Sequence, residues 1–139
     1  MAANPALFIS PEEYLEIDSK TDRPSEYLNG RMVEVEGSTE NHALIMTNLV
    51  TAVVTSLRTK NSDCRAYSHT LRVHMHKTGH YAYPDLVMTS GKRTFEAYDT
   101  LLNPILIIEA LSPTTQKRRQ VCVLSLHPLT SGILDHRAG

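Results

Sequence analysis

Two short apolar runs, each carrying a single carboxylate, constrain the fold of this chain more than any other feature. Asp85 follows Pro84 within residues 81–88, and Glu109 lies within residues 105–112, at positions where a half-buried strand normally carries valine or isoleucine. A buried carboxylate is costly unless it is paired or binds a cation. On neighbouring strands the two carboxylates would repel, and a divalent cation such as Mg²⁺ or Mn²⁺ would relieve that repulsion. The alternative is that Asp85 caps a turn and Glu109 forms a buried salt bridge.

Length, composition and charge define a broad class of protein. The 139 residues fit one domain with a single core, and 41% apolar with 21% charged residues is typical of a soluble globular protein. A formal net charge of -1 gives no argument for nucleic-acid binding. Cys64 and Cys122 lie far apart, so neither a zinc knuckle nor a disulfide framework is indicated. Without a leader-like N-terminus or a long apolar run, we expect a cytoplasmic protein with no membrane span.

Local signals predict a helix and a hairpin in the first part of the chain. Ser10 can cap a helix, Pro11 suits its first position, and Glu13 can complete a capping box. This helix is expected to end before residue 19. The dipeptide Asn29-Gly30 then predicts a tight hairpin turn, because both central positions of such a turn need positive φ.

Hydrophobic periodicity predicts the remaining elements. Residues 38–60 form the main helix, because apolar residues recur at helical spacing from Ile45 to Leu57, and this broad stripe is expected to pack across a sheet. Alternating patterns then predict strands at residues 64–68, 70–76, 80–89 and 104–111, with the last one central in its sheet. An unbroken strand at 80–89 would place Tyr81, Tyr83 and Asp85 on one face, with the tyrosines as packing residues. The order of elements predicts an α/β fold with a mixed sheet.

Four short motifs occur in order within residues 10–115. They are the hairpin Glu26-Tyr27-Leu28-Asn29-Gly30-Arg31, the helix start Asn41-His42, the pair Pro84-Asp85, and the segment Ile107-Ile108-Glu109-Ala110-Leu111-Ser112-Pro113-Thr114-Thr115. Together they resemble the Uma-two family of restriction-endonuclease-like proteins, a branch of the PD-(D/E)xK nuclease superfamily. The resemblance implies an α/β fold of restriction-endonuclease type, in which a mixed β-sheet is flanked by helices and a metal is held at the sheet edge.

The resemblance also implies a set of site residues. Asp85 and Glu109 match the metal-binding carboxylates of the family, with help from the main-chain carbonyl of Ala110. Glu26 and His42 match positions that face the same site and would orient water or other ligands. The function implied is that of a Mg²⁺- or Mn²⁺-dependent endonuclease that hydrolyses DNA, and proteins of this type commonly form homodimers to address two strands.

The chain departs from the family pattern after Glu109. The superfamily lysine normally lies two residues after this glutamate, where Leu111 stands, and the lysine of Uma-two proteins lies on a later helix. Residues 118–123 replace that later stretch here, so Lys117 or Arg118 would have to supply the positive charge of the missing lysine. We therefore expect a domain at residues 1–117 and an atypical tail at residues 118–139, truncated or out of frame. The missing lysine supports an alternative function, a catalytically inactive remnant of the fold that acts as a binding or interaction protein.

A histidine cluster supports a third interpretation. His74 and His76 would share one face of a strand, and a turn would bring His80 near them. Neutral imidazoles are ligands for zinc and other transition metals, so a histidine-based transition-metal binder is the remaining alternative. The ordinary explanation is a solvated strand face that is rich in histidine.

Overall fold

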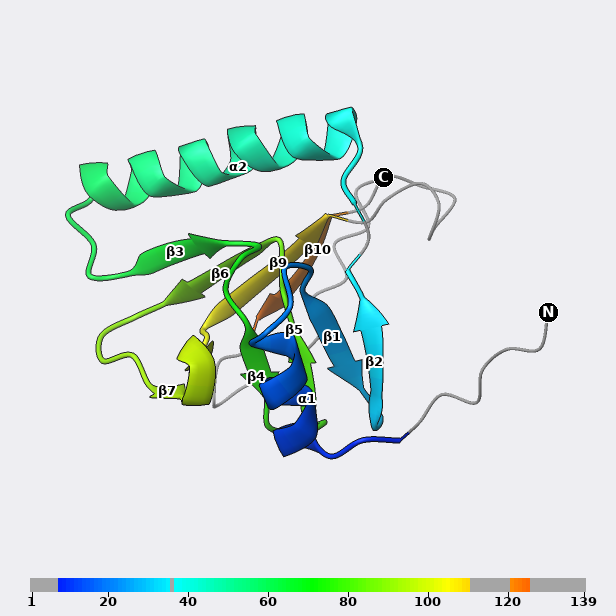
Figure 1. Ribbon diagram of the computed structural model, residues 1–139. Helices are drawn as coiled ribbons and strands as arrows, with labels where there is room; N and C mark the ends of the chain where they lie inside the picture. Colours follow the sequence, from blue (N-terminus) through cyan, green and yellow to red (C-terminus); the bar gives the residue numbers. More distant parts are fainter. Residues whose placement is uncertain (1–7, 36, 111–120, 126–139) are drawn as a thin grey trace.

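The computed structural model describes residues 8–35, 37–110 and 121–125, and Figure 1 shows their arrangement. These residues form two α-helices, ten short strands and one 3-10 turn. Strands β4 (Val73–Met75) and β8 (Thr100–Leu101) run parallel, whereas the other paired strands run antiparallel. The α/β class with mixed strand pairing and flanking helices is thus confirmed.

The first helix and the first hairpin form as the local signals predict. Helix α1 (Pro11–Asp18) begins with a complete capping box, in which Glu13 N donates to Ser10 Oγ and Ser10 N donates to the Glu13 carboxylate. Strands β1 (Ser25–Leu28) and β2 (Arg31–Glu34) are joined by Asn29 at φ 50° and Gly30 at φ 80°. Both turn residues are therefore left-handed, as this type of hairpin requires.

The strands divide into two sheets. The six-stranded sheet has the order β2-β1-β5-β4-β8-β7, where β5 is His80–Ala82 and β7 is Phe95–Glu96. The four-stranded sheet has the order β10-β9-β6-β3, and its members are β3 (Arg65–Ser68), β6 (Leu86–Thr89), β9 (Leu106–Ala110) and β10 (Val121–Ser125). The 3-10 turn η1 (Ala97–Asp99) lies between β7 and β8. Strand β9 has a neighbour on each side, which confirms its predicted central position.

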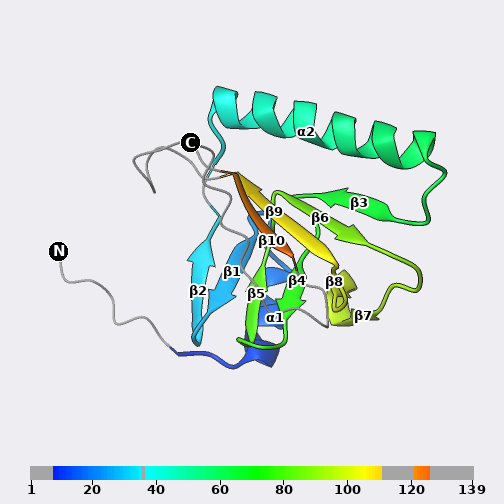
Figure 2. The same cartoon turned by 180° about the vertical axis from the view of Figure 1, so that it is seen from behind.

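Helix α2 (Glu40–Thr59) lies along the four-stranded sheet, above β3 and β6 (Figures 1 and 2). Thr39 caps it, because its hydroxyl accepts the main-chain N–H of His42. The predicted apolar stripe faces the sheet but is only half buried, and no residue of this helix is fully buried. Leu44 and Ile45 remain 59% and 41% exposed. The helix therefore covers the sheet loosely.

The expectation of one strand over residues 80–89 is wrong. The chain leaves the six-stranded sheet after β5 and enters the four-stranded sheet at β6, with Tyr83, Pro84 and Asp85 between them. Proline has no N–H to donate to a strand ladder, which favours a break at this point. Pro84 is fully buried at the crossing. Asp85 is consequently placed where the two sheets meet, immediately before β6.

One apolar cluster joins the two sheets. Val73 and Leu101 come from the six-stranded sheet, Val87 and Ile107 come from the four-stranded sheet, and all four are fully buried. Burial of this kind is worth roughly 1.5–3 kcal/mol per large aliphatic side chain. The shared core therefore fixes β6 and β9 relative to β4 and β8. Within the described part of the chain, no helix is long and apolar enough to cross a membrane.

Candidate functional site

The two carboxylates singled out by the sequence meet at the end of one strand pair. Strand β6 pairs antiparallel with β9, and Leu86 is the register partner of Ile108. Continuing this register by one residue sets Asp85 opposite Glu109. Directly opposed residues of an antiparallel pair point to the same face of the sheet. The prediction that these two strands lie side by side is therefore confirmed.

Asp85 is held by contacts from two other elements. Its Oδ2 accepts the main-chain N–H of Ala110, at 2.7 Å, from the end of β9. Its Oδ1 lies 3.1 Å from Nε2 of His42, in the first turn of α2. A carboxylate oxygen can only accept, so the imidazole N–H donates in this contact. The side chains of His42 and Asp85 are 21% and 16% exposed, which leaves the pair accessible to a small ligand.

Glu26 reaches the same region from the hairpin. Its Oε1 accepts the main-chain N–H of Tyr83, at 3.3 Å. This bond ties β1 to the segment that leads into Asp85. Its negative charge also acts on Glu109, as described below. The structure thus brings together all four side chains that the family resemblance implies, and they come from β1, α2, the segment before β6, and β9.

Glu109 has the most perturbed acidity in this group. Burial raises its pKa first, and the negative charges of Asp85 and Glu26 raise it further, to about 8. A carboxyl group in this state holds a proton at neutral pH when no cation is present. The raised pKa is the electrostatic consequence of carboxylates crowded into a poorly solvated place. Strongly perturbed groups of this kind are common at functional sites.

The donor chemistry fits a hard divalent cation. Carboxylate and main-chain oxygens are the ligands that Mg²⁺ and Mn²⁺ prefer, and a cation would compensate the crowded charges of Asp85 and Glu109. In the residues that the structure describes, no three or more His, Cys, Asp or Glu side chains form a ready-made metal site. The side chains thus supply two strand-borne carboxylates, and further ligands would be main-chain oxygens or water.

The predicted histidine cluster does not assemble as three ligands. The rings of His74 and His76 are 4.4 Å apart, but Nε2 of His80 lies 3.0 Å from the side-chain oxygen of Asn29 instead. The His74 ring stacks on Tyr81 with centroids 4.2 Å apart. Its Nδ1 lies 3.0 Å from a carboxylate oxygen of Glu96, although these two buried atoms are not aligned for a hydrogen bond. His74 and His76 therefore pack on this face of the sheet, and the three histidines do not converge on a common zinc position.

A buried ion pair beside the site was not predicted from the sequence. Asp18 Oδ2 accepts from Arg72 Nη2 and from the hydroxyl of Tyr83, each at 2.5 Å, and Asp18 Oδ1 accepts from Ser25 N at 2.7 Å. Arg72 Nη1 donates to the hydroxyl of Thr100. This network fixes Tyr83, two residues before Asp85. No periodic pattern could have paired Asp18 with Arg72, because they are far apart in sequence and sit on different elements.

The positions that concern the missing lysine lie outside the described residues. These are Leu111, Lys117 and Arg118. The proposed boundary between residues 117 and 118 stays a prediction. Strand β10 lies beyond that boundary and pairs with β9 in the four-stranded sheet, where Cys122 is the register partner of Glu109.

Comparisons with known proteins identify a family. The model of the Uma2 family, described as "Putative restriction endonuclease", matches residues 11–123. An uncharacterized protein of Synechocystis sp. is 30% identical over 108 residues, which are 78% of this chain and 56% of that protein. The chain therefore spans little more than half the length of this relative. No solved structure gives a significant match. Because the family model covers most of the chain, the protein belongs to the Uma2 family, the one that its motifs resemble.

Proposed function

We propose that this protein is a divalent-metal-dependent endonuclease that hydrolyses phosphodiester bonds of DNA at the Asp85–Glu109 site. The observation that supports the proposal is the pairing of β6 with β9, because its register, continued by one residue beyond Leu86 and Ile108, would bring Asp85 opposite Glu109. The family description supports a nuclease-type activity. The identity of the metal, the identity of the substrate and the role of each site residue all belong to this proposal.

Asp85, Glu109 and the main-chain carbonyl of Ala110 would hold Mg²⁺ or Mn²⁺. A bound divalent cation lowers the pKa of water and neutralises the charge that develops on the phosphate. Glu109 must give up its proton before it can act as a ligand, and its raised pKa means that this happens as the cation arrives. The Ala110 N–H already orients the Asp85 carboxylate through Oδ2, and Oδ1 of the same carboxylate faces His42.

His42 and Glu26 have supporting roles in this proposal. His42 donates to Asp85 and so fixes the plane of that carboxylate, much as outer hydrogen-bond partners orient metal ligands elsewhere. Glu26 is anchored through Oε1 by the Tyr83 N–H, and its other oxygen is available to orient an attacking water. We also propose a homodimer, because cleavage of both strands of a duplex needs two such sites. Light scattering of the purified protein tests that state.

A cleavage assay tests the activity. Supercoiled plasmid is incubated with the protein in Mg²⁺ or Mn²⁺, beside Asp85→Asn and the control variant His74→Ala. Loss of a metal ligand removes several kcal/mol of transition-state stabilisation, which is a fall in rate of at least about 100-fold. We expect cleavage by the wild type and by His74→Ala, and none above background by Asp85→Asn. Equal cleavage by all three would refute the assignment of the site.

One observation favours a second candidate function, a binding protein that no longer cleaves. Leu111 stands where the superfamily carries its lysine, and a lysine there would stabilise the phosphate charge in the transition state. The two functions differ in one measurable respect. A binding protein would take up Mn²⁺ and DNA with dependence on Asp85 and give no plasmid cleavage, whereas an endonuclease would also give the cleavage products.

A further inference from the structure

A cleft lined by arginines lies at the free edge of the four-stranded sheet, at the end remote from Asp85. It has a volume of about 550 Å³ and lies between the C-terminal end of α2 and the edge strand β3. Arg58, Arg65 and Arg93 all line it. We propose that this cleft binds the phosphate backbone of a polynucleotide.

Three separate elements supply the three arginines. Arg58 lies in the last turn of α2, and Arg65 begins β3. Arg93 follows β6, and its Nη1 donates to the hydroxyl of Tyr67 at 3.3 Å. The pairing of β3 with β6, in which Arg65 is the partner of Thr89, brings the beginning of β3 beside the segment that carries Arg93. The fold therefore gathers these guanidinium groups at one place.

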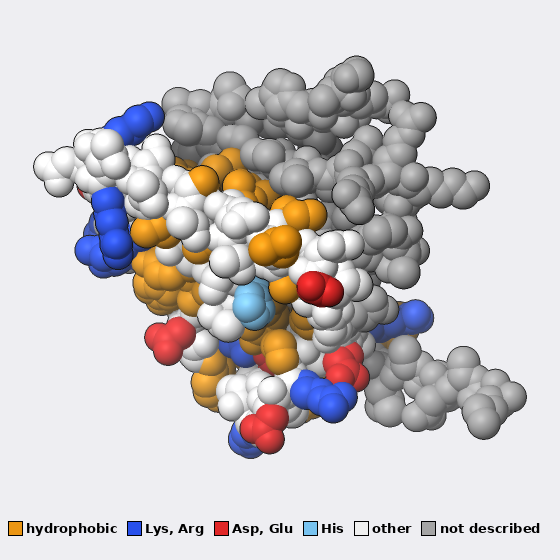
Figure 3. Space-filling view, turned by 90° about the horizontal axis from the view of Figure 1, so that it is seen from above, with side chains coloured by type: hydrophobic (Ala, Val, Ile, Leu, Met, Phe, Trp, Pro, Cys, Tyr) orange, Lys and Arg blue, Asp and Glu red, His pale blue; other side chains and the backbone are white. Residues whose placement is uncertain are grey.

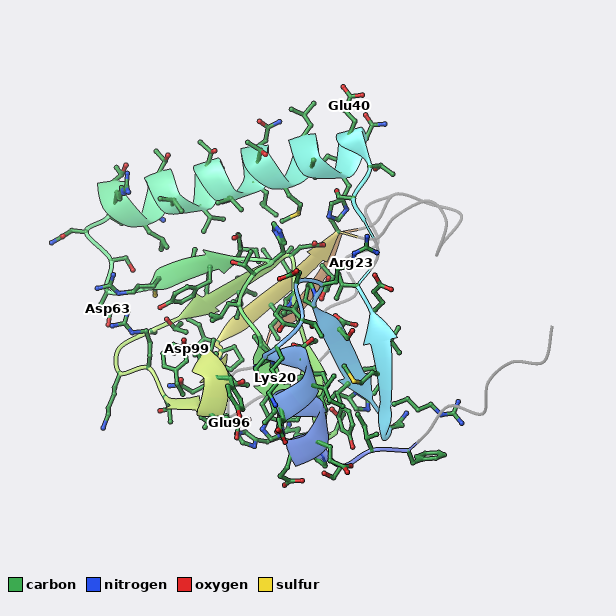
Figure 4. All side chains as sticks on the ribbon, in the orientation of Figure 1. Lys20, Arg23, Glu40, Asp63, Glu96 and Asp99 are labelled. Atoms are coloured by element: carbon green, nitrogen blue, oxygen red, sulfur yellow. The ribbon has the colours of Figure 1, made fainter. Side chains whose placement is uncertain are left out.

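The positive charge of the cleft is not compensated by ion pairs in the described part of the chain. The ion pairs of lysine and arginine there involve Lys20, Arg23 and Arg72, and none involves an arginine of the cleft. In Figure 3, lysine and arginine side chains are seen at the end of the molecule where α2 ends, and others lie elsewhere on this face. Asp63 lies near this end, whereas Glu40 marks the other end of α2, where the helix begins (Figure 4). With a net charge of -1, the chain has no general basic excess that would account for three arginines lining one cleft.

The lining fits a phosphodiester chain in chemistry and in shape. Guanidinium groups bind phosphate oxygens through paired N–H donors, which is why arginine dominates phosphate recognition. All three arginines are exposed, so their guanidinium groups are accessible to a phosphate backbone from solvent. Tyr67 and Leu57 add an aromatic and an apolar surface, against which a sugar or a base can rest.

The position of the cleft also fits a nucleic acid that reaches Asp85. Helix α2 runs from His42, beside Asp85, to Arg58, and this span is roughly 24 Å at 1.5 Å per residue. That length corresponds to about seven base pairs at about 3.4 Å each. The cleft would then anchor the backbone several base pairs from the point of cleavage. This last step rests on the proposed function, whereas phosphate binding by the cleft does not.

The test measures DNA binding without metal, so that no cleavage occurs. The anisotropy of a labelled duplex is followed with EDTA at several salt concentrations, for the wild type and for the triple variant Arg58→Gln/Arg65→Gln/Arg93→Gln. Loss of three phosphate contacts should make the slope of log K against log salt shallower by about 2.7. A matched triple variant, Lys20→Gln/Arg23→Gln/Lys77→Gln, removes the same charge elsewhere and should keep the wild-type slope.

Several outcomes would overturn the proposal. A cleft variant with the wild-type slope would show that DNA does not bind there, and equal changes in both triple variants would show only a net-charge effect. Displacement of the duplex by inorganic phosphate or a mononucleotide at comparable concentration would indicate a site for a small anion. Asp85→Asn could affect neither Mn²⁺ binding nor cleavage while the cleft variant loses DNA binding. In that case the proposed function would be refuted, and the proposal that the cleft binds the phosphate backbone would be supported.

Discussion

Asp85 stands one residue before the Leu86–Ile108 pair of β6 and β9, which brings it opposite Glu109, and Asp85 is held by both a main-chain N–H and an imidazole. The contrast between them has an electrostatic consequence. Asp85 accepts hydrogen bonds from Ala110 and His42, whereas burial and the negative charges of its neighbours raise the pKa of Glu109 to about 8. Without a cation, Glu109 therefore holds a proton at neutral pH.

The raised pKa of Glu109 predicts how stability depends on pH. The folded protein holds this proton more tightly than the unfolded chain, whose glutamate has the model value of 4.5. The associated stability is complete below about pH 4.5 and is lost as the pH rises through about 8, at a rate of at most about 1.4 kcal/mol per pH unit. Chemical denaturation of the metal-free protein should show this fall. Glu109→Gln should flatten it, whereas Glu12→Gln, on the exposed face of α1, should not.

The buried pair of Asp18 and Arg72 predicts a large stability effect. Arg72→Met leaves the Asp18 carboxylate buried with only the Tyr83 hydroxyl and the Ser25 N–H as donors. Removing one partner of a buried pair costs about 3–5 kcal/mol. Urea denaturation should reveal this loss. The matched change Lys20→Met, at a solvent-exposed pair with Glu16, should leave the midpoint nearly unchanged.

The contact between His42 and Asp85 predicts an effect on metal affinity. His42→Ala removes the donor that fixes one oxygen of Asp85, and changes of this kind typically weaken metal binding about 10–100-fold. Calorimetric titration with Mn²⁺ measures the loss. His69→Ala, at an exposed position between β3 and β4, serves as the control and should bind like the wild type. Equal affinities for the two variants would remove His42 from the site.

The hairpin turn predicts a difference between two glycines. Gly30 has φ +80°, and an added Cβ would meet the ring of Phe8 at 2.6 Å. The exposed Phe8 ring can move, so the left-handed backbone dominates, and Gly30→Ala should cost about 1–2 kcal/mol. Gly37→Ala meets nothing within 4 Å and should be close to neutral. Thermal denaturation of both variants tests this, and equal melting temperatures would contradict it.

Elements specified by local chemistry could be predicted from the sequence. The capping box of Ser10 and Glu13 and the Asn29-Gly30 turn depend only on residues a few positions apart. The adjacency of Asp85 and Glu109 was also predictable, because each lies in a short apolar run typical of a strand and the two strands were expected to be neighbours. The roles assigned to Asp85, Glu109, Glu26, His42 and Ala110 all stay predictions, although the structure brings these residues to one place.

Features that depend on long-range packing could not be predicted in this way. The alternating pattern of residues 80–89 continues through Pro84, yet the chain changes sheets there because buried surface on both sides outweighs local strand preference. Arg72 shares its strand pattern with His74, so alternation assigned it a polar face, whereas the fold buries it against Asp18. The cleft arginines likewise come from three elements that only the tertiary structure gathers.

The central claim is that Asp85 and Glu109 form a site for a divalent cation, and Mn²⁺ titration by calorimetry tests it most directly. The wild type is titrated beside Asp85→Asn and His74→Ala, since metal binding requires the carboxylates and does not require a lysine. We predict binding by the wild type and by His74→Ala, and loss of binding in Asp85→Asn. Absence of Mn²⁺ binding by the wild type, or binding that is lost only in His74→Ala, would contradict the claim.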